Sequence, residues 1–351
     1  TGGGCPHILA EPQRTNLIPY SEDFTQWSLI NSTILSGNTI SPDGTVNADR
    51  ITSTSTGDSA FVRNTQSTQT VSTVYSYSCF VKKGTTDFVR LANRSLGNVS
   101  EASCWFDIQN GVVGDVGSNV SSTEIESFGD GWYRCTVIGT TGGTISTQLT
   151  DIAAATSNGN ASATTGDYIY YWGAQLEQGS YPTSLIPTSG STVTRNQDIF
   201  TRDGIGSLIN SQEGVLFLEI AALSNDGTNR AISISDGTLN NRIFVFYSTS
   251  SNQVRVQGKV GNVVQFSFTE SILNATNFIK LAIKYKENDF ALWLDGVEVD
   301  TDSSGVTFPA DTLNELQFAV GGTSSRFFGK VKQLQVYESA LTDDQLSSLT
   351  K

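Results

Sequence analysis

Residues 168–178 read Tyr-Ile-Tyr-Tyr-Trp-Gly-Ala-Gln-Leu-Glu-Gln, and this stretch constrains the fold more than any other. Aromatic and β-branched side chains favour extended backbone, and a Gly-Ser-Tyr-Pro run follows at 179–182. We therefore predict one long strand that closes a β domain begun upstream. Rings stand on both faces of this strand. One face should be core, and the other should be covered by later chain or open to a ligand.

Short β-rich runs between Gly, Asn and Asp turns recur along all 351 residues. A chain of this length is typical of two domains, and strands at such spacing favour sandwiches. Residues 139–166, rich in Gly, Ser, Thr and Ala, predict a mobile loop holding at most one short strand. The expected class is all-β: two antiparallel β-sandwich (jelly-roll) domains in tandem and a short C-terminal helix. The expected segments are an N-terminal junction (1–15), a jelly roll (16–186), a docked linker (187–212) and a second domain (213–351).

The charge and the rarity of histidine limit the possible functions. A net charge of -13 disfavours nucleic acid and anionic membranes as partners, and no apolar run is long enough to insert into a membrane. His7 is the sole histidine, so a serine nucleophile would lack the usual base. The pairs Glu124/Glu126 and Glu298/Asp300 have glycosidase-like spacing but read as solvated strand faces. We predict no catalytic residues and no enzyme.

Three of the four cysteines lie in strand-like runs: Cys79, Cys104 and Cys135. Their spacing matches no zinc pattern, so they are expected to act as small buried apolar residues. A disulfide between two facing strands is the alternative. The chain opens with Thr-Gly-Gly-Gly and no Met, which indicates a piece of a longer polypeptide.

Asn110-Gly111 predicts a two-residue hairpin loop, with Gln109 opposite Val112. Alternation then places Cys104, Phe106 and Ile108 on a core face. The other face carries Trp105, Asp107 and Gln109, an indole beside two polar groups. Sugar rings stack on such an indole while their hydroxyls bond to the polar groups, so these three residues are candidate carbohydrate ligands. The alternative is that Trp105 packs under a neighbouring sheet or loop.

Further candidate contacts follow the same alternation. Trp132 and Arg134 lie opposite the apolar Tyr-Cys-Val face and are either rim residues or a structural cation–π pair. Asp295-Gly296 predicts a type I′ hairpin pairing Leu294 with Val297 and Leu292 with Val299, and it leaves Trp293 either exposed or covered by the other sheet. Arg326 and Phe327 form either a contact patch or a cap on the core.

The last residues carry a strong helix signal. Thr342 and Gln345 have the spacing of a capping box, and Leu341 and Leu346 have the spacing of a hydrophobic staple. We predict a short helix beginning after Thr342.

Several motifs resemble known families. The Asn-Leu pair at 16–17, the acidic-Phe pair at 23–24 and Trp27 look like the first strand of galactose-binding-type jelly rolls, the fold of many carbohydrate-binding modules. Together with Ser-Pro-Asp-Gly-Thr (41–45), Phe-Val-Lys-Lys-Gly (80–84), Gly-Trp-Tyr-Arg-Cys (131–135) and residues 172–179, this pattern resembles phage tail-fibre and tailspike modules. From residue 213, the hairpin, the Gly-Lys-Val strand and the final helix resemble the concanavalin A-like, laminin G-like lectin fold.

These resemblances imply a function. The chain would be a non-catalytic, glycan-binding (receptor-binding) fragment of a phage tail fibre or tailspike, recognising bacterial surface polysaccharide as a homotrimer on the extracellular virion tail. The alternatives are an accessory carbohydrate-binding region of a secreted polysaccharide-degrading enzyme, and a structural spacer or trimerisation part of a fibre.

The resemblances also imply a strand neighbour and a metal. The strand at 168–178 should lie beside the opening strand over 16–27. Calcium is the one cofactor they allow, at Glu22 and Asp23 in the first domain and at Asp226 and Asp236 in the second. Where such jelly rolls supply a further carboxylate, this chain has Trp172 and Gly173, which weakens the first site.

Overall fold

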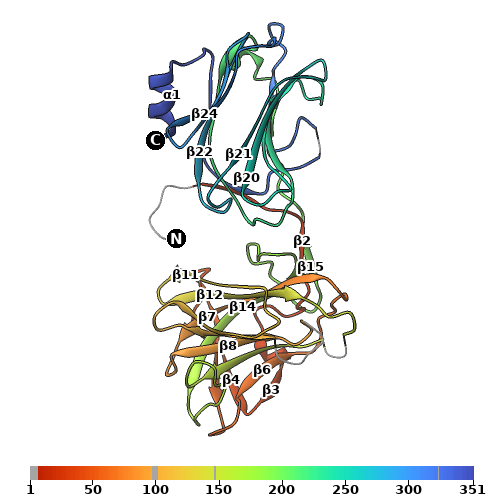
Figure 1. Ribbon diagram of the computed structural model, residues 1–351. Coiled ribbons are helices and arrows are strands. Elements are labelled where there is room, and N and C mark those ends of the chain that lie inside the picture. The colour runs from red at the N-terminus through yellow and green to blue at the C-terminus, as the bar shows by residue number, and fades with distance from the viewer. Residues whose placement is uncertain (1–6, 97–101, 146–147, 323) are drawn as a thin grey trace. The chain divides into compact units, whose positions relative to one another are not determined.

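The computed structural model describes residues 7–96, 102–145, 148–322 and 324–351 (Figure 1). The all-β class is confirmed, with antiparallel β-sandwiches in tandem and one short terminal helix. Two compact units divide the described chain, the first over 13–196 and the second over 7–12 and 197–351. The segments expected as a junction (1–15) and a linker (187–212) are thus each shared between the two units. Within these ranges no helix is long and apolar enough to cross a membrane.

Two six-stranded sheets form the first unit, and a small pair accompanies them. We name each sheet after one of its strands. The β14 sheet has, in order, β11 (Ser122–Gly129), β12 (Trp132–Thr140), β7 (Val74–Lys83), β14 (Tyr168–Gln178), β5 (Val46–Ser53) and β4 (Ser32–Ile40). The β9 sheet has β10 (Val112–Val116), β9 (Ser103–Asp107), β8 (Phe88–Asn93), β13 (Thr150–Ala155), β6 (Phe61–Asn64) and β3 (Ser28–Ile30). The pair is β15 (Val193–Arg195) with β2 (Arg14–Asn16), and a 3-10 turn spans Phe24–Gln26.

Strand β14 has the bounds that the sequence indicated, and it lies at the centre of its sheet. Its first half pairs with β5, and its pairing with β7 is interrupted between Trp172 and Gln175, where Gly173 has φ +60°. Beyond this bulge β14 continues to pair with β7, and the opening segment replaces β5 along its other edge. The Leu17 N–H donates to the Leu176 carbonyl at 2.8 Å. The expected neighbour therefore lies beside β14, as irregular backbone rather than as a strand of the sheet.

The three described cysteines lie in the apolar layer between these sheets. Cys79, Cys104 and Cys135 are fully buried and free. Cys79 and Cys135 face each other across β7 and β12 without a bond. The expectation of small buried apolar residues is confirmed, and no disulfide joins the facing strands of this part of the chain.

The second unit repeats the two-layer design. The β17 sheet has β1 (Ile8–Ala10), β26 (Gly329–Tyr337), β17 (Glu213–Ala222), β22 (Ile279–Lys286), β23 (Phe290–Leu294) and β24 (Val297–Asp302). The β19 sheet has β16 (Thr201–Arg202), β25 (Glu315–Gln317), β18 (Arg230–Ser235), β19 (Arg242–Tyr247), β20 (Gln253–Val260) and β21 (Val263–Ser271). A 3-10 turn spans Gly206–Leu208. Pairing of β1 with β26 explains why the first described residues belong to this unit.

The helix α1 (Asp343–Thr350) begins as its caps indicated. The Thr342 side chain accepts from the Gln345 N–H, and the Gln345 side chain accepts from the Thr342 N–H at 2.9 Å, so the capping box is confirmed. Leu346 packs in a cluster with Trp293, and Leu341 contacts the same cluster. The helix thereby covers the outer face of the β17 sheet.

Both predicted hairpins form, but each register differs from the prediction. Val112 pairs with Asp107 rather than with Gln109, because the Asp107 carboxylate accepts the N–H groups of Gln109 and Asn110 and makes a four-residue loop. In the second hairpin, Asp295 and Gly296 both have positive φ, and Leu294 faces Val297 as predicted.

Beyond that turn, Leu292 faces Asp300 and not Val299. The pairing of β23 with β24 shifts between Leu292 and Trp293, and β24 contributes one extra residue there. A bulge of this kind moves every later pair by one position.

Candidate carbohydrate-binding face

The outer face of the β9 sheet places Trp105 beside an arginine. Cys104 and Phe106 point into the core, so Trp105 between them points outward, where it is partly exposed. Its direct cross-strand neighbour is Arg90 on β8. The indole Nε1 is buried and has no hydrogen-bond partner among the described residues. The structure thus places the indole on the outer face, with part of the ring exposed and its Nε1 covered.

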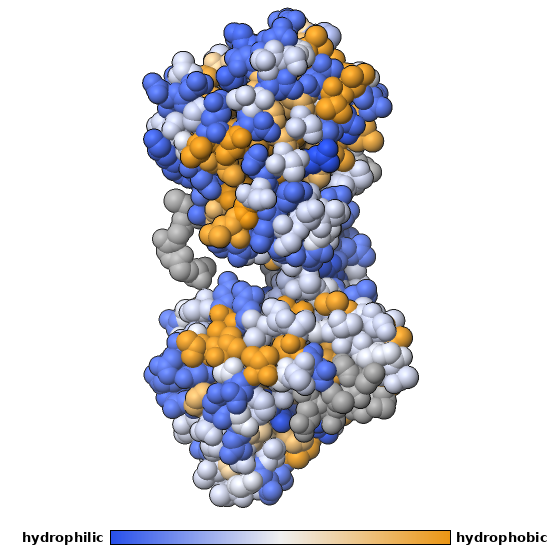
Figure 2. All heavy atoms as spheres, in the orientation of Figure 1, coloured by the Kyte–Doolittle hydropathy of each residue, from blue (hydrophilic) through white to orange (hydrophobic). Residues whose placement is uncertain are grey.

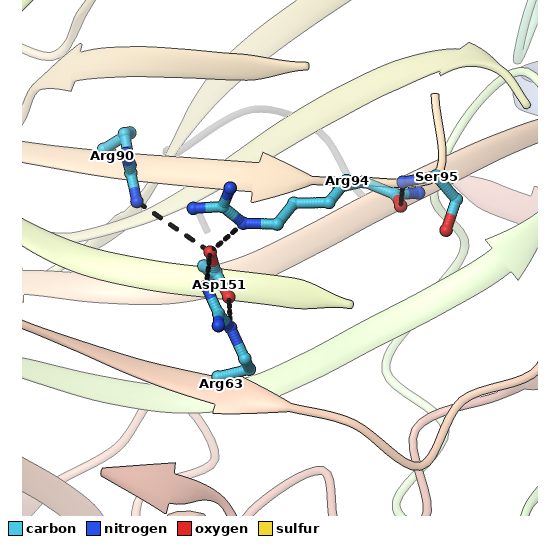
Figure 3. A network of polar contacts seen from close by, with 6 residues as sticks. Arg63, Arg90, Arg94, Ser95 and Asp151 are labelled. Carbon is cyan, nitrogen blue, oxygen red and sulfur yellow. Dashed lines mark hydrogen bonds and ion pairs between the residues drawn. The ribbon is translucent and has the colours of Figure 1, made fainter. Parts of the chain in front are cut away.

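A buried carboxylate organises the same face (Figure 3). Asp151 on β13 is fully buried. Arg63 from β6 donates two hydrogen bonds to its carboxylate, from Nε to Oδ1 at 2.7 Å and from Nη2 to Oδ2 at 3.0 Å. Arg94, just beyond β8, donates its Nε–H to Oδ2, and Arg90 Nη2 lies 3.9 Å from that oxygen. A buried carboxylate is costly without such partners, so the arginines and Asp151 hold one another in place.

Small side chains line the sheet between these polar groups and the rings. Ala153 faces Arg90 on one side and Phe61 on the other, and the Arg63 guanidinium lies 4.7 Å from the centre of the Phe61 ring. Ala92 and Ala155 are also buried on this face. The result is a row of a partly exposed indole, an arginine, a small floor and a second ring. This arrangement offers ring surfaces to a ligand beside arginine side chains that are 12–23% exposed.

The two polar residues expected beside Trp105 form hydrogen bonds in and near the hairpin loop. Asp107 accepts hydrogen bonds within its own hairpin loop, including 2.8 Å from the Asn110 side chain. Gln109 accepts a hydrogen bond from Lys83. Asp107 lies on the same face of β9 as Trp105 but is engaged in the turn, and the changed register places Gln109 in the loop. Their role as ligands stays a prediction.

Trp132 and Arg134 are buried on the outer face of the β14 sheet and are not rim residues. The Trp132 Nε1–H donates to the Ile40 carbonyl at 3.0 Å, and its ring packs with Phe80 and Trp172. Arg134 lies over the Phe80 ring at 5.3 Å and donates to Ser78. The cation–π alternative is correct in kind, but the ring is Phe80.

The candidates of the second unit are mostly buried too. Trp293 is 7% exposed because α1, and not the other sheet, covers it. Phe327 packs in the core against Phe318, which supports the core-cap alternative. Arg326 is half-buried and bridges to Ala231 on β18. Of these three residues, only Arg326 reaches the surface.

The carboxylates proposed as calcium ligands accept hydrogen bonds from nearby residues. Asp23 caps the 3-10 turn through the Thr25 N–H, and Glu22 accepts from the Asn47 side chain at 3.4 Å. Burial raises the pKa of Glu22.

In the second unit Asp226 accepts from Arg230 at 2.7 Å, and Asp236 accepts from Asn241 at 2.8 Å. Across the described ranges, no group of three or more His, Cys, Asp or Glu side chains could hold a metal.

Sequence reasoning missed the arginine–carboxylate cluster. Asp151 lies in the Ala- and Thr-rich stretch expected to be mobile, yet β13 is wholly buried in the middle of its sheet. A signal was present: Asp151 alternates with Ala153 and Ala155 against Ile152 and Ala154, and the second set faces the core.

Comparison with known proteins supports a lectin-like second unit. Similar solved structures include the CBM40 module of Ruminococcus gnavus IT-sialidase, at 16% identity over 43% of this chain and 98% of that chain, with a TM-score of 0.35. Domains LG4-5 of mouse laminin alpha1 are 11% identical over 99% and 95% of the two chains, with a TM-score of 0.30. Scores this low carry no further argument. No curated protein matches the chain. Residues 217–347 match the family model of the concanavalin A-like lectin/glucanases superfamily, so this part of the second unit is similar to that superfamily.

Proposed function

We propose that this chain is a non-catalytic glycan-binding fragment whose ligand lies on the outer face of the β9 sheet. The observation that carries the proposal is the position of Trp105, partly exposed and directly opposite Arg90 on the face that Asp151 and its arginines organise. The indole supplies a stacking surface for a sugar ring, and guanidinium N–H groups donate to its oxygens. The lectin-like match of the second unit supports the same class of ligand.

The proposal includes a biological setting. The fragment belongs to a phage tail fibre or tailspike, acts as a homotrimer on the virion outside the cell, and binds the surface polysaccharide of a bacterial host. The five motifs shared with fibre modules support this setting. Any sequence that precedes Thr1 in the natural polypeptide would test it: a fibre-type region is expected there, and a polysaccharide-degrading catalytic domain would assign the chain to an enzyme instead. Sedimentation of the chain should give the mass of a trimer, and a monomeric mass would contradict that part.

Glycan binding is tested by titrating the intact chain against a panel of bacterial surface polysaccharides. Trp105→Ala should weaken binding by about thirtyfold, the effect of losing a central aromatic contact worth about 2 kcal/mol. Tyr168→Ala removes a partly exposed ring on the other sheet and serves as the matched control, with unchanged binding. Absence of binding across the panel, or equal binding by Trp105→Ala and wild type, would refute the site.

A further inference from the structure

A groove of about 640 Å³ opens at one edge of the second unit, between its two sheets. Strands β1 and β26 line it from the β17 sheet, and β16 and β25 line it from the β19 sheet. The lining is largely apolar, with Phe200, Leu316, Phe318, Val331 and Leu334 between the two sheet edges. Its volume falls within the range of small-molecule sites.

About half of the lining comes from segments outside the part of the chain that resembles the lectin superfamily. Ile8 and Ile199 line the groove and are 45% and 61% exposed. Both precede residue 217, where the match begins. Apolar side chains gather in patches on the visible surface of the molecule (Figure 2). Large side chains left exposed along a groove mark a ligand surface more often than an ordinary stretch of surface.

Arg202 brings a positive charge to this apolar lining. It pairs with Leu316 across β16 and β25, so its side chain lies on the inner side of the sheet with those of Phe200 and Leu316. Among the described residues it makes no ion pair. An inward charge on an edge strand also discourages edge-to-edge pairing, and that structural role is the alternative to a ligand contact.

The other two basic residues of the lining, Lys332 and His7, contact neighbouring side chains. Lys332 Nζ lies 3.2 Å from the Glu219 carboxylate and 4.0 Å from the centre of the Phe278 ring. His7 meets the same ring edge-on at 5.8 Å. Arg202 is therefore the group placed to receive an anion at the mouth of the groove.

We propose that this groove binds a free fatty acid, with the hydrocarbon chain along the apolar lining and the carboxylate on the Arg202 guanidinium. The apolar lining favours hydrocarbon over sugar, because a sugar would lose hydrogen bonds to water that these side chains cannot replace. A guanidinium pairs with a carboxylate through two parallel N–H donors. This site is independent of the glycan face on the first unit.

Calorimetric titration of the intact chain with octanoate, decanoate and dodecanoate tests the proposal. Each added methylene should tighten binding about fourfold. Dodecanol, which has the same chain and no charge, should bind at least about tenfold more weakly than dodecanoate. Affinity that does not grow with chain length, or dodecanol binding as tightly as dodecanoate, would overturn the proposal.

Two variants with matched controls complete the test. Ile199→Glu places a like charge in the groove and should abolish dodecanoate binding, whereas the same change at Leu273, which is 93% exposed and outside the groove, should leave it intact. Arg202→Gln should weaken dodecanoate about tenfold and leave dodecanol unchanged, whereas Arg255→Gln on β20 should change neither. Unaltered binding by Ile199→Glu or Arg202→Gln would restrict these residues to a structural role and refute the site.

Discussion

The buried Asp151 carboxylate offers the sharpest test of how the first unit is held together. Asp151→Asn keeps the side-chain volume and removes the charge that Arg63, Arg94 and Arg90 surround. Removing one partner of a buried ion pair typically costs about 3–5 kcal/mol. Here the arginine side chains are 12–23% exposed, so water can reach them partly and the lower figure, about 3 kcal/mol, applies.

Urea unfolding followed by tryptophan emission measures this cost. Four of the five tryptophans, Trp27, Trp105, Trp132 and Trp172, lie in the first unit, so the signal mainly reports its unfolding. With a denaturant slope of roughly 2 kcal/mol per molar, a loss of about 3 kcal/mol lowers the midpoint by about 1.5 M.

Two comparisons separate the buried network from ordinary surface charge. Asp87→Asn removes a carboxylate that is 50% exposed and pairs with Lys83, and it should change stability by less than about 0.5 kcal/mol. Combining Arg63→Gln with Asp151→Asn should cost about 1–3 kcal/mol less than the sum of the single changes. A loss below about 1 kcal/mol for Asp151→Asn, or additive single changes, would refute the ion-pair reasoning.

Three further outcomes follow from single groups. Thr342→Ala removes the capping box of α1 and should destabilise the second unit by about 1 kcal/mol in thermal unfolding, while Ser348→Ala, at an exposed mid-helix position, should cost less. In a Cys5→Ser chain at pH 8, an aromatic disulfide reagent should modify no thiol until denaturant is added. The reason is that burial raises the pKa of Cys104 to about 11 and raises the pKa values of Cys79 and Cys135 further. Rapid labelling of the folded chain would contradict this. Burial raises the pKa of Glu22, so the carboxylate that forms as pH rises is less stable in the folded chain than in the unfolded chain. Glu22→Gln should therefore raise the unfolding midpoint at pH 7 and have no effect well below pH ~4, where Glu22 is protonated in both states. An equal effect at both pH values would exclude this cause.

Local sequence patterns were sufficient to predict a strand and its core face where the strand carries large side chains. The bounds of β14, the inward Cys104 and Phe106, and the α1 capping box all follow from alternation and capping rules applied to neighbouring residues. The same rules failed for β13, because its neighbours supply the bulk that its own side chains lack. Ala153 is fully buried between Arg90 and Phe61, so a small residue there reflects crowding rather than a loop.

Strands that pair with a distant part of the chain could not be predicted from local sequence either. The three residues of β1 form a strand because β26, near the other end of the chain, offers its edge to them. Nothing in Ile8–Ala10 alone distinguishes this segment from a linker, and its partner is set by how the second unit closes. The expected domain boundaries therefore followed the order of the chain, whereas the units follow the pairing.

Alternation along a strand identifies which side chains share a face, and it leaves open what covers that face. Trp105, Trp132 and Trp293 were all correctly placed opposite a core face, yet Trp132 lies under residues near Ile40 and Trp293 lies under α1. Trp105 keeps its exposure on a face whose cross-strand neighbours are arginine and alanine, so no large apolar surface needs a cover there. Because Asp151 neutralises part of that arginine charge without reaching solvent, the polar face is stable with part of its indole exposed.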